Sequence, residues 1–104
     1  MLLFYITCKD FEEASNIAQK LVEEKLIASA NVYPNISSYY YWKGAMHQSN
    51  ECTIFAKTIE AKEKQVEKRV KELHSYEIPC IISFKTESIN KEYEKWAKET
   101  LAIK

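Results

Sequence analysis

The pattern of hydrophobic and polar positions divides the first part of the chain into a strand-like and a helix-like segment. Residues 2–8 form a short apolar run rich in aromatic and β-branched side chains, which is typical of a buried strand. Asp10 follows at once and is a helix-start signal. The segment after it is amphipathic, because apolar side chains recur every three or four residues. These positions are Ala14, Ile17, Ala18, Leu21 and Val22.

Alternating apolar positions predict two further strands joined by a turn. The first strand covers residues 29–42, and we expect a bulge at Pro34 because proline removes a hydrogen-bond donor from a strand. Gly44 is the only glycine and marks the hairpin turn, where a positive φ costs little. We expect residues 47–50 to be polar loop positions in this turn region. The second strand is predicted to run through residues 52–57.

The second half of the chain predicts a helix, a strand and a last helix. Residues 60–74 combine helically spaced apolar positions with a lysine- and glutamate-rich outer face. A turn over 75–79 then leads into a strand over 80–86, and Asn90 opens the last helix. The apolar positions are Val66, Val70 and Leu73 in the first of these helices, and Tyr93, Trp96, Ala97 and Leu101 in the second.

The resulting order of elements, βαββαβα, indicates an α+β fold. Its first six elements give the ferredoxin-like βαββαβ arrangement, in which both helices cover one face of a four-stranded antiparallel sheet, and the C-terminal helix is an addition. The four consecutive aromatic residues 39–42 must point to both sides of a strand, so one copy cannot bury them all. We expect one domain over residues 1–104 that associates with further copies of itself.

The composition of the chain limits the kinds of partner and the cellular compartment that we expect. Fifteen basic and fifteen acidic residues cancel, and Arg69 is the only arginine, which argues against nucleic acid or a membrane surface as a partner. Three widely spaced cysteines, Cys8, Cys52 and Cys80, are predicted to be reduced and buried. The N-terminal apolar run ends at Lys9 and is too short for a signal peptide or a membrane span, so we expect a cytoplasmic protein.

Five short segments stand in an order and spacing that resemble the CutA family of divalent-cation tolerance proteins. They are VEEKLIA at 22–28, PNISSYYYWKG at 34–44, AKT at 56–58, HSYEIP at 74–79 and YEKW at 93–96. The resemblance implies a ferredoxin-like subunit in a homotrimer. Pairing of strands around a threefold axis would also remove the exposed aromatic hairpin and the free sheet edges. The implied function is tolerance of divalent cations such as copper, without enzymatic activity.

The resemblance also implies a copper site and a small-ligand cleft between subunits. The resemblance implies that, as in some family members, copper is bound through a histidine and a first-strand cysteine, and His74 matches the histidine. Ile6 stands at the position of the cysteine, whereas Cys8 lies two residues further with the same strand parity. We therefore expect copper or another divalent cation at His74. The cleft residues that we expect are Lys57, Tyr76 and Glu77.

Other functions are considered against the same residues. An acylphosphatase-type enzyme needs an arginine in the loop after the first strand, which residues 8–10 lack, and an RNA-recognition domain needs a glycine-aromatic motif that residues 54–57 lack. His74 has a purely structural alternative, because a cation at a helix C-terminus meets the helix dipole favourably. His47, beside a methionine, is a weaker candidate for a soft metal. A trimeric scaffold that anchors an unidentified protein and binds no metal also stays open.

Overall fold

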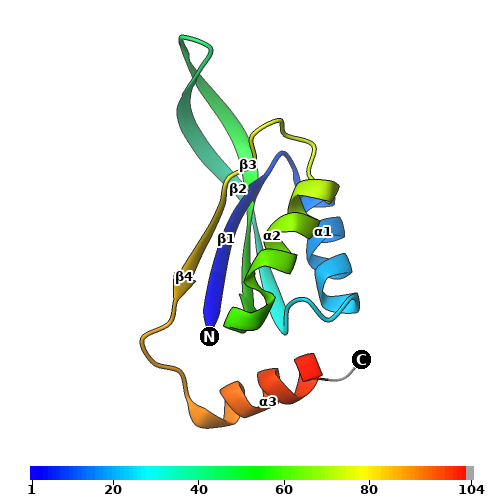
Figure 1. The fold of residues 1–104 in the computed structure, drawn as a ribbon. Coiled ribbons are helices and arrows are strands. Elements are labelled where there is room, and N and C mark those ends of the chain that lie inside the picture. The colour runs from blue at the N-terminus through cyan, green and yellow to red at the C-terminus, as the bar shows by residue number, and fades with distance from the viewer. Residues whose placement is uncertain (103–104) are drawn as a thin grey trace.

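Four strands form one antiparallel sheet in the computed structural model, which describes residues 1–102 (Figure 1). The strands are β1 (Leu2–Cys8), β2 (Ser29–Trp42), β3 (Ala45–Thr58) and β4 (Ile81–Lys85). Their spatial order is β2-β3-β1-β4, so β1 pairs with β3 on one side and β4 on the other. The element order βαββαβα and this sheet order confirm the predicted split βαβ arrangement.

Two of the three α-helices lie on the same face of the sheet (Figure 1). These are α1 (Phe11–Glu23) and α2 (Glu63–Leu73), and a short 3-10 helix, η1 (Glu60–Lys62), leads into α2. The side chain of Asp10 accepts a hydrogen bond of 2.8 Å from the Glu13 backbone N–H, which confirms the predicted N-cap of α1. The third helix, α3 (Lys91–Ala102), crosses beneath the end of the sheet at which β1 begins (Figure 1).

The hydrophobic core lies between the sheet and the first two helices. Alternate residues of β1 are buried, because successive side chains of a strand point to opposite faces. The buried set combines Leu2, Phe4, Ile6 and Cys8 of β1 with Ala14, Ile17, Ala18 and Leu21 of α1 and Val66 and Val70 of α2. A smaller cluster of Ala28, Ala97 and Leu101 packs α3 against the end of the sheet. Among residues 1–102, no helix lies over the opposite face of the sheet (Figure 1).

Two apolar positions predicted for the inner faces of helices are wrong. Val22 is 39% exposed, because it lies in the last turn of α1, at the margin of the stripe that faces the sheet. Trp96 is 46% exposed, and its ring lies 5.4 Å from the ring of Tyr93. Because α3 meets the end of the sheet and not its face, only the narrow stripe of Ala97 and Leu101 is buried.

The prediction that residues 47–50 form a loop is also wrong, because β3 begins at Ala45 and pairs with β2 from there on. The turn consists of Lys43 and Gly44, whose φ angles are 51° and 80°. A two-residue turn of this kind fixes the register of both strands, and backbone hydrogen bonds then hold the polar stretch in the ladder. The pairing shifts register between Tyr33 and Ile36, which confirms the bulge predicted at Pro34.

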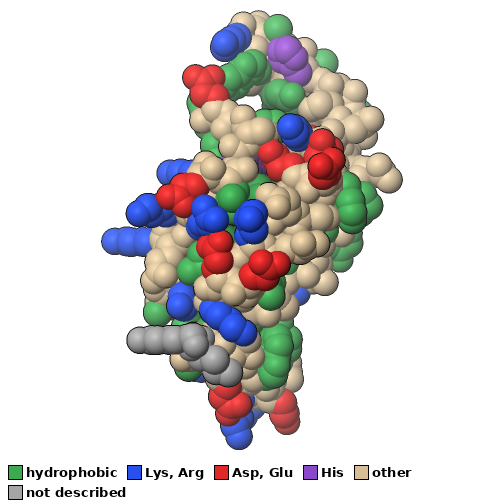
Figure 2. Space-filling view, turned by 90° about the vertical axis from the view of Figure 1, so that its right-hand side faces the viewer, with side chains coloured by type: hydrophobic (Ala, Val, Ile, Leu, Met, Phe, Trp, Pro, Cys, Tyr) green, Lys and Arg blue, Asp and Glu red, His purple; other side chains and the backbone are tan. Residues whose placement is uncertain are grey.

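The surface of the helix-covered side shows no patch of a single charge. Acidic and basic side chains are interspersed over the body of the molecule in the space-filling view, and hydrophobic side chains are visible both on the hairpin and on the body (Figure 2). Within residues 1–102, no helix is both long enough and apolar enough to cross a lipid bilayer. All three cysteines are free thiols; Cys8 and Cys52 are buried as predicted, whereas Cys80 is half-buried and lies just before β4.

Neighbouring residues of α1 provide a test of this packing. We expect Leu21→Ala to lower the free energy of unfolding by about 2–5 kcal/mol, because the fully buried side chain leaves a cavity beneath the helix. Val22→Ala should lower it by about 1 kcal/mol or less, because that residue is already 39% exposed and its truncation leaves no closed cavity. Urea denaturation followed by circular dichroism, at one fixed protein concentration, measures both values. Equal losses in the two variants would contradict the assignment of the buried stripe.

Candidate functional site

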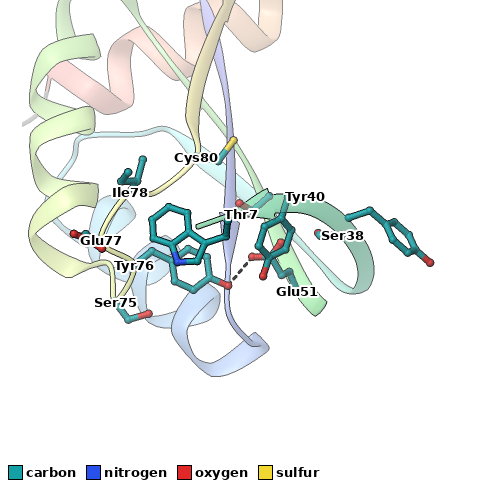
Figure 3. Close-up of a pocket in the computed structure, with 11 residues that line it drawn as sticks. Thr7, Ser38, Tyr40, Glu51, Ser75, Tyr76, Glu77, Ile78 and Cys80 are labelled. Carbon is teal, nitrogen blue, oxygen red and sulfur yellow. Dashed lines mark hydrogen bonds between the residues drawn. The ribbon is translucent and has the colours of Figure 1, made fainter. Parts of the chain in front are cut away.

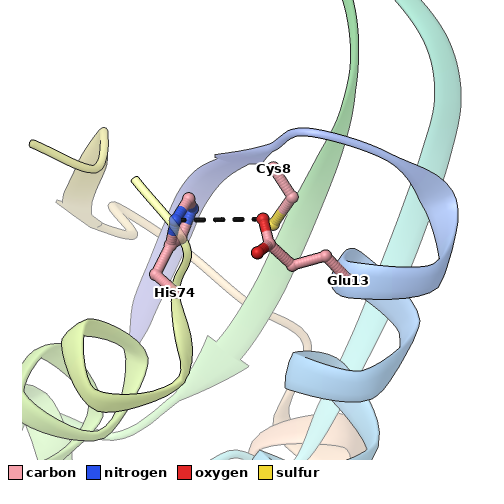
Figure 4. A group of neighbouring side chains, drawn as sticks. All are labelled: Cys8, Glu13 and His74. Carbon is pink, nitrogen blue, oxygen red and sulfur yellow. Dashed lines mark ion pairs between the residues drawn. The ribbon is translucent and has the colours of Figure 1, made fainter. Parts of the chain in front are cut away.

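Three potential metal ligands meet where β1 leads into α1 and where α2 ends (Figure 4). Cys8 is the last residue of β1, Glu13 lies in the first turn of α1, and His74 caps the C-terminus of α2. The thiol sulfur, a carboxylate oxygen and a ring nitrogen all lie within 4.8 Å of one another. The side chain of His74 is fully buried and that of Glu13 is 9% exposed. We call these three side chains the Cys8–Glu13–His74 cluster.

The hydrogen bonds of His74 define which ring nitrogen could bind a metal. Nε2 lies 2.7 Å from the backbone carbonyl oxygen of Thr7, and because a carbonyl only accepts, Nε2 carries the proton and donates. Nδ1 is then an acceptor, and it receives the backbone N–H of Tyr76 at 3.1 Å. It also lies 3.9 Å from the Glu13 carboxylate. A carbonyl partner on the far nitrogen is the usual way in which proteins orient a metal-binding histidine.

Glu13 joins the loops on the two sides of the cluster. Its Oε1 accepts the backbone N–H of Lys9 at 3.2 Å, and its Oε2 accepts the backbone N–H of Ser75 at 3.0 Å. The carboxylate therefore ties the turn before α1 to the loop after α2. These two bonds also fix the carboxylate beside His74 Nδ1.

The thiol of Cys8 is protonated at neutral pH. Burial is the main cause that raises its pKa to about 12, and the nearby Glu13 carboxylate adds to the shift. The thiolate is the form that binds metals, so a cation has to displace the thiol proton. The thiol and the imidazole nevertheless form, with the carboxylate, a mixed donor set that suits copper or zinc better than magnesium or calcium. The residues present thus fit a divalent cation of the borderline or soft kind.

A pocket of about 570 Å³ adjoins this cluster, between the hairpin and the loop after α2 (Figure 3). Its lining includes Thr7, Tyr40, Trp42, Glu51, Tyr76 and Glu77. The phenol of Tyr76 donates a hydrogen bond of 2.6 Å to Oε2 of Glu51, whose residue is only 8% exposed. Burial, followed by the Glu51 carboxylate, raises the pKa of Tyr76, so the phenol stays protonated and donates. Tyr76 consequently contacts both the cluster and the pocket.

The structure brings some of the predicted site residues together and separates others. Tyr76 and Glu77 both line the pocket, and His74 lies two positions before Tyr76 in the sequence. Lys57 lies elsewhere, near the end of β3, where its ammonium donates to the side-chain oxygen of Asn31. His47 lies on the hairpin, where its ring stacks on Tyr40 with 5.7 Å between centroids, and it does not belong to the cluster.

Two site residues were missed from the sequence. The sequence-based prediction gives Glu13 no role in a site, although a carboxylate five residues after a cysteine, across a strand-to-helix turn, was a usable signal. Glu51 immediately follows the residues assigned to a loop, and nothing local marks it as buried. Its burial depends on Tyr76, which is 25 residues away in sequence.

The fold and the site together define a small α+β protein with a candidate site for a divalent cation. A family model described as CutA1 divalent ion tolerance protein matches residues 2–100. The chain belongs to this CutA1 family.

Relatives and solved structures agree with this assignment. The divalent-cation tolerance protein CutA of Thermotoga maritima is 40% identical over 101 residues, which cover 97% of this chain and 99% of the relative. The crystal structure of the divalent ion tolerance protein CutA1 from Ehrlichia chaffeensis superposes with a TM-score of 0.94 at 32% identity, covering 98% of this chain and 95% of that one. The structure of a protein described as the periplasmic CutA of Archaeoglobus fulgidus gives a TM-score of 0.93 at 38% identity, covering 97% and 99%.

The burial of the three cysteines predicts their order of reaction. At pH 8, a thiol with a pKa of about 12 is ionised in about one molecule in ten thousand, so Cys8 should not react with a disulfide reagent such as Ellman's reagent in the folded protein. Buried Cys52 should also be protected, and half-buried Cys80 should give the fast phase. Stopped-flow absorbance measures the phases. Cys80→Ser should remove the fast phase, and its persistence in that variant would contradict the assignment.

Proposed function

We propose that the protein is a non-enzymatic, cytoplasmic divalent-cation tolerance protein that binds copper, or another soft divalent cation, at the Cys8–Glu13–His74 cluster. The observation that carries this proposal is the meeting of three different ligand types within 4.8 Å. Membership of the CutA1 family supports the tolerance function, because the relatives are described as tolerance proteins and not by a reaction. Sequestration needs only tight binding, and the cluster offers ligands for it.

The chemistry of the cluster follows from its three groups. His74 would bind the metal through Nδ1, while its Nε2–H continues to donate to the Thr7 carbonyl oxygen. Glu13 would bind through a carboxylate oxygen and give up one of its hydrogen bonds from a backbone N–H. Cys8 would release its thiol proton. Three protein ligands leave one position of a tetrahedral set for water or a further group.

The uncovered face of the sheet supports a homotrimer as the working form. Aromatic and aliphatic side chains on this face are exposed to an extent of 55% for Tyr33, 46% for Ile82 and 51% for Phe84. Phe55 packs edge-to-face between Tyr5 and Tyr33, with centroids 5.5 Å and 5.4 Å away. A continuous apolar face of this kind favours association. The free edges of the sheet and the projecting hairpin would be paired by neighbouring copies in a closed ring.

A trimer would also complete the predicted ligand cleft. Tyr76 and Glu77 belong to the pocket within one chain. Lys57 would have to come from a neighbouring subunit, because within its own chain it lies near the other end of β3. The net charge of zero favours small ligands or protein partners over nucleic acid or a membrane surface.

A second candidate function is a trimeric scaffold that anchors another protein without metal. It is favoured by the fact that His74 and Glu13 already have hydrogen-bond partners within the protein, so the cluster is stable as a purely structural contact. The two functions differ in metal uptake, and the next experiment separates them.

The two histidines allow a matched test of metal binding. We expect the purified protein, titrated with Cu(II) and in parallel with Zn(II) under argon, to take up about one ion per chain at micromolar metal. His74→Ala and Cys8→Ser should each weaken the affinity by roughly tenfold or more, because each loses a ligand. His47→Ala is the control and should bind as the parent does. Absence of saturable uptake, or equal uptake by all four proteins, would exclude this site and leave the scaffold function.

The assembly is tested by mass in solution. Light scattering should give three times the 12.2 kDa mass of one chain. Phe84→Lys places a charge on the uncovered face and should reduce the mass, because burying an unpaired ammonium in an interface costs several kcal/mol. Val22→Lys, on the helix-covered side, should leave the trimer intact. A parent protein that runs as a monomer would contradict the proposed assembly.

A further inference from the structure

We propose that Cys8 and Cys52 are a dithiol that reduces Cu(II) held at the Cys8–Glu13–His74 cluster to Cu(I) and is itself oxidised to a disulfide. The proposal rests on the metal site of the proposed function and adds an electron transfer to it. Two features of the fold lead to it. The strand register places the two cysteines opposite each other, and one of them belongs to the cluster.

The two cysteines face each other across β1 and β3. In this antiparallel pair, Cys8 is the Cα partner of Cys52. Directly opposed residues of such a pair lie on the same face of the sheet, with Cα atoms about 4.5 or 5.5 Å apart. Disulfides span Cα separations of about 4.4–6.8 Å, which includes both values. The register therefore allows a disulfide between the two strands without a change in their pairing.

Both thiols lie in the core, on the face of the sheet that α1 and α2 cover. Cys8 is fully buried and Cys52 is 4% exposed. Burial, then the Glu13 carboxylate and then the Cys52 thiol raise the pKa of Cys8 to about 12, so the two sulfur atoms lie within electrostatic reach of each other. Cys80, in contrast, lines the pocket beside Tyr76 and is not part of this core. The fold thus sets one pair of cysteines apart from the third.

Copper is the oxidant that can act on this buried pair. Oxidants that need a free thiolate are excluded, because burial keeps Cys8 protonated. A metal ion that binds Cys8 displaces the thiol proton and so creates the thiolate within the core. Cu(II) can then accept an electron, and thiolate sulfur favours the Cu(I) that results. Zinc has no redox chemistry of this kind, so it can bind at the same ligands without oxidising them.

The reaction balances with two copper ions for each pair of cysteines. Each thiol gives up one proton and one electron, the protons pass to water, and the new bond joins Sγ of Cys8 to Sγ of Cys52. Each Cu(II) accepts one electron and becomes Cu(I), so two ions are reduced one after the other. The reaction consumes the dithiol and is not catalytic, in agreement with a non-enzymatic function. The disulfide also withdraws the Cys8 sulfur from the cluster.

Peptide mapping of the full-length protein tests the pairing. Cleavage after lysine and arginine places Cys8, Cys52 and Cys80 on three different peptides, residues 1–9, 44–57 and 72–85. The reduced protein is mixed under argon with two equivalents of Cu(II), or of Zn(II) as the control, and is then quenched in acid and alkylated. We expect linked peptides 1–9 and 44–57 with Cu(II) and none with Zn(II). Absence of this link with Cu(II), a predominant link to Cys80, or the same link with Zn(II) would overturn the proposal.

The copper product is measured in the same reaction. A chelator specific for Cu(I), such as bathocuproine disulfonate, is added after the reaction and should report about two Cu(I) per chain from its absorbance. Protein unfolded in urea is the control for the pairing, because without the strand register links to Cys80 should form as well. Formation of the 1–9 to 44–57 link alone in the unfolded protein would show that the fold does not select the pair and would contradict the proposal.

Three variants assign the electron transfer to the pair and the cluster. Cys52→Ser should slow the formation of Cu(I) by about tenfold or more, because no second thiol faces Cys8. His74→Ala should slow it by about tenfold or more, because Cu(II) is then held less tightly. Cys80→Ser is the matched control and should react at the rate of the parent. Unchanged rates in Cys52→Ser or His74→Ala, or an equal loss in Cys80→Ser, would overturn the proposal; the peptide map decides if a variant is unfolded by circular dichroism.

Uptake of Zn(II) separates the failure of this proposal from the failure of the proposed function. Zn(II) uptake that His74→Ala weakens, in a protein that forms no disulfide with Cu(II), would contradict the redox pair alone and leave the metal site. Where the disulfide forms, the oxidised protein should bind Zn(II) more weakly than the reduced protein by about tenfold or more, because one ligand is lost. Equal Zn(II) affinity before and after oxidation would contradict the link between the pair and the cluster.

Discussion

The hydrogen bond from His74 Nε2 to the carbonyl oxygen of Thr7 is the contact on which both candidate sites depend. It joins the end of α2 to the end of β1, 67 residues apart in sequence, in a fully buried position. Because it fixes the tautomer of His74, it leaves Nδ1 as an acceptor beside Glu13 and for the Tyr76 N–H. The loop after α2 is held in this way, and Tyr76 can then reach Glu51 across the pocket. Loss of this one bond would therefore disturb the cluster and the pocket together.

Tyr76 is the physical link between the two sites. Its backbone N–H occupies the lone pair of His74 that a metal would use, and its phenol donates to the Glu51 carboxylate that lines the pocket. A cation on Nδ1 competes with the Tyr76 N–H, and displacement of that N–H moves the same residue whose ring forms a wall of the pocket. Coupling between two binding sites is reciprocal, so an occupant of the pocket would change the affinity of His74 for metal by the same factor.

The sequence predicts the elements of the fold well because each of them carries a period of its own. The sequence-based prediction fails where contacts with another element decide the outcome. The polar half of β3, from Ala45, is a strand because β2 pairs with it. Trp96 is exposed because α3 contacts only the end of the sheet. The site follows the same rule. His74 could be predicted from its segment, whereas the role of Glu13 arises from Ser75, 62 residues away. Cys8 is the last residue of β1 and lies beside the loop that follows α2, whereas Ile6 does not belong to the cluster. The sequence alone does not show that this loop passes the end of β1.

In the proposed metal site, the raised pKa of Cys8 would select among cations. A thiol with a pKa of about 12 releases its proton only when the metal–sulfur bond offsets the cost of ionising it in a buried position. Hard ions such as magnesium bind thiolate too weakly to do so and keep most of their water, whereas copper and other soft ions form strong bonds to sulfur. The same burial keeps the thiol from reacting with oxidants, because the thiolate is the reactive form. A buried, protonated cysteine is thus compatible with the proposed function, since it would stay inert until a soft cation reached the cluster.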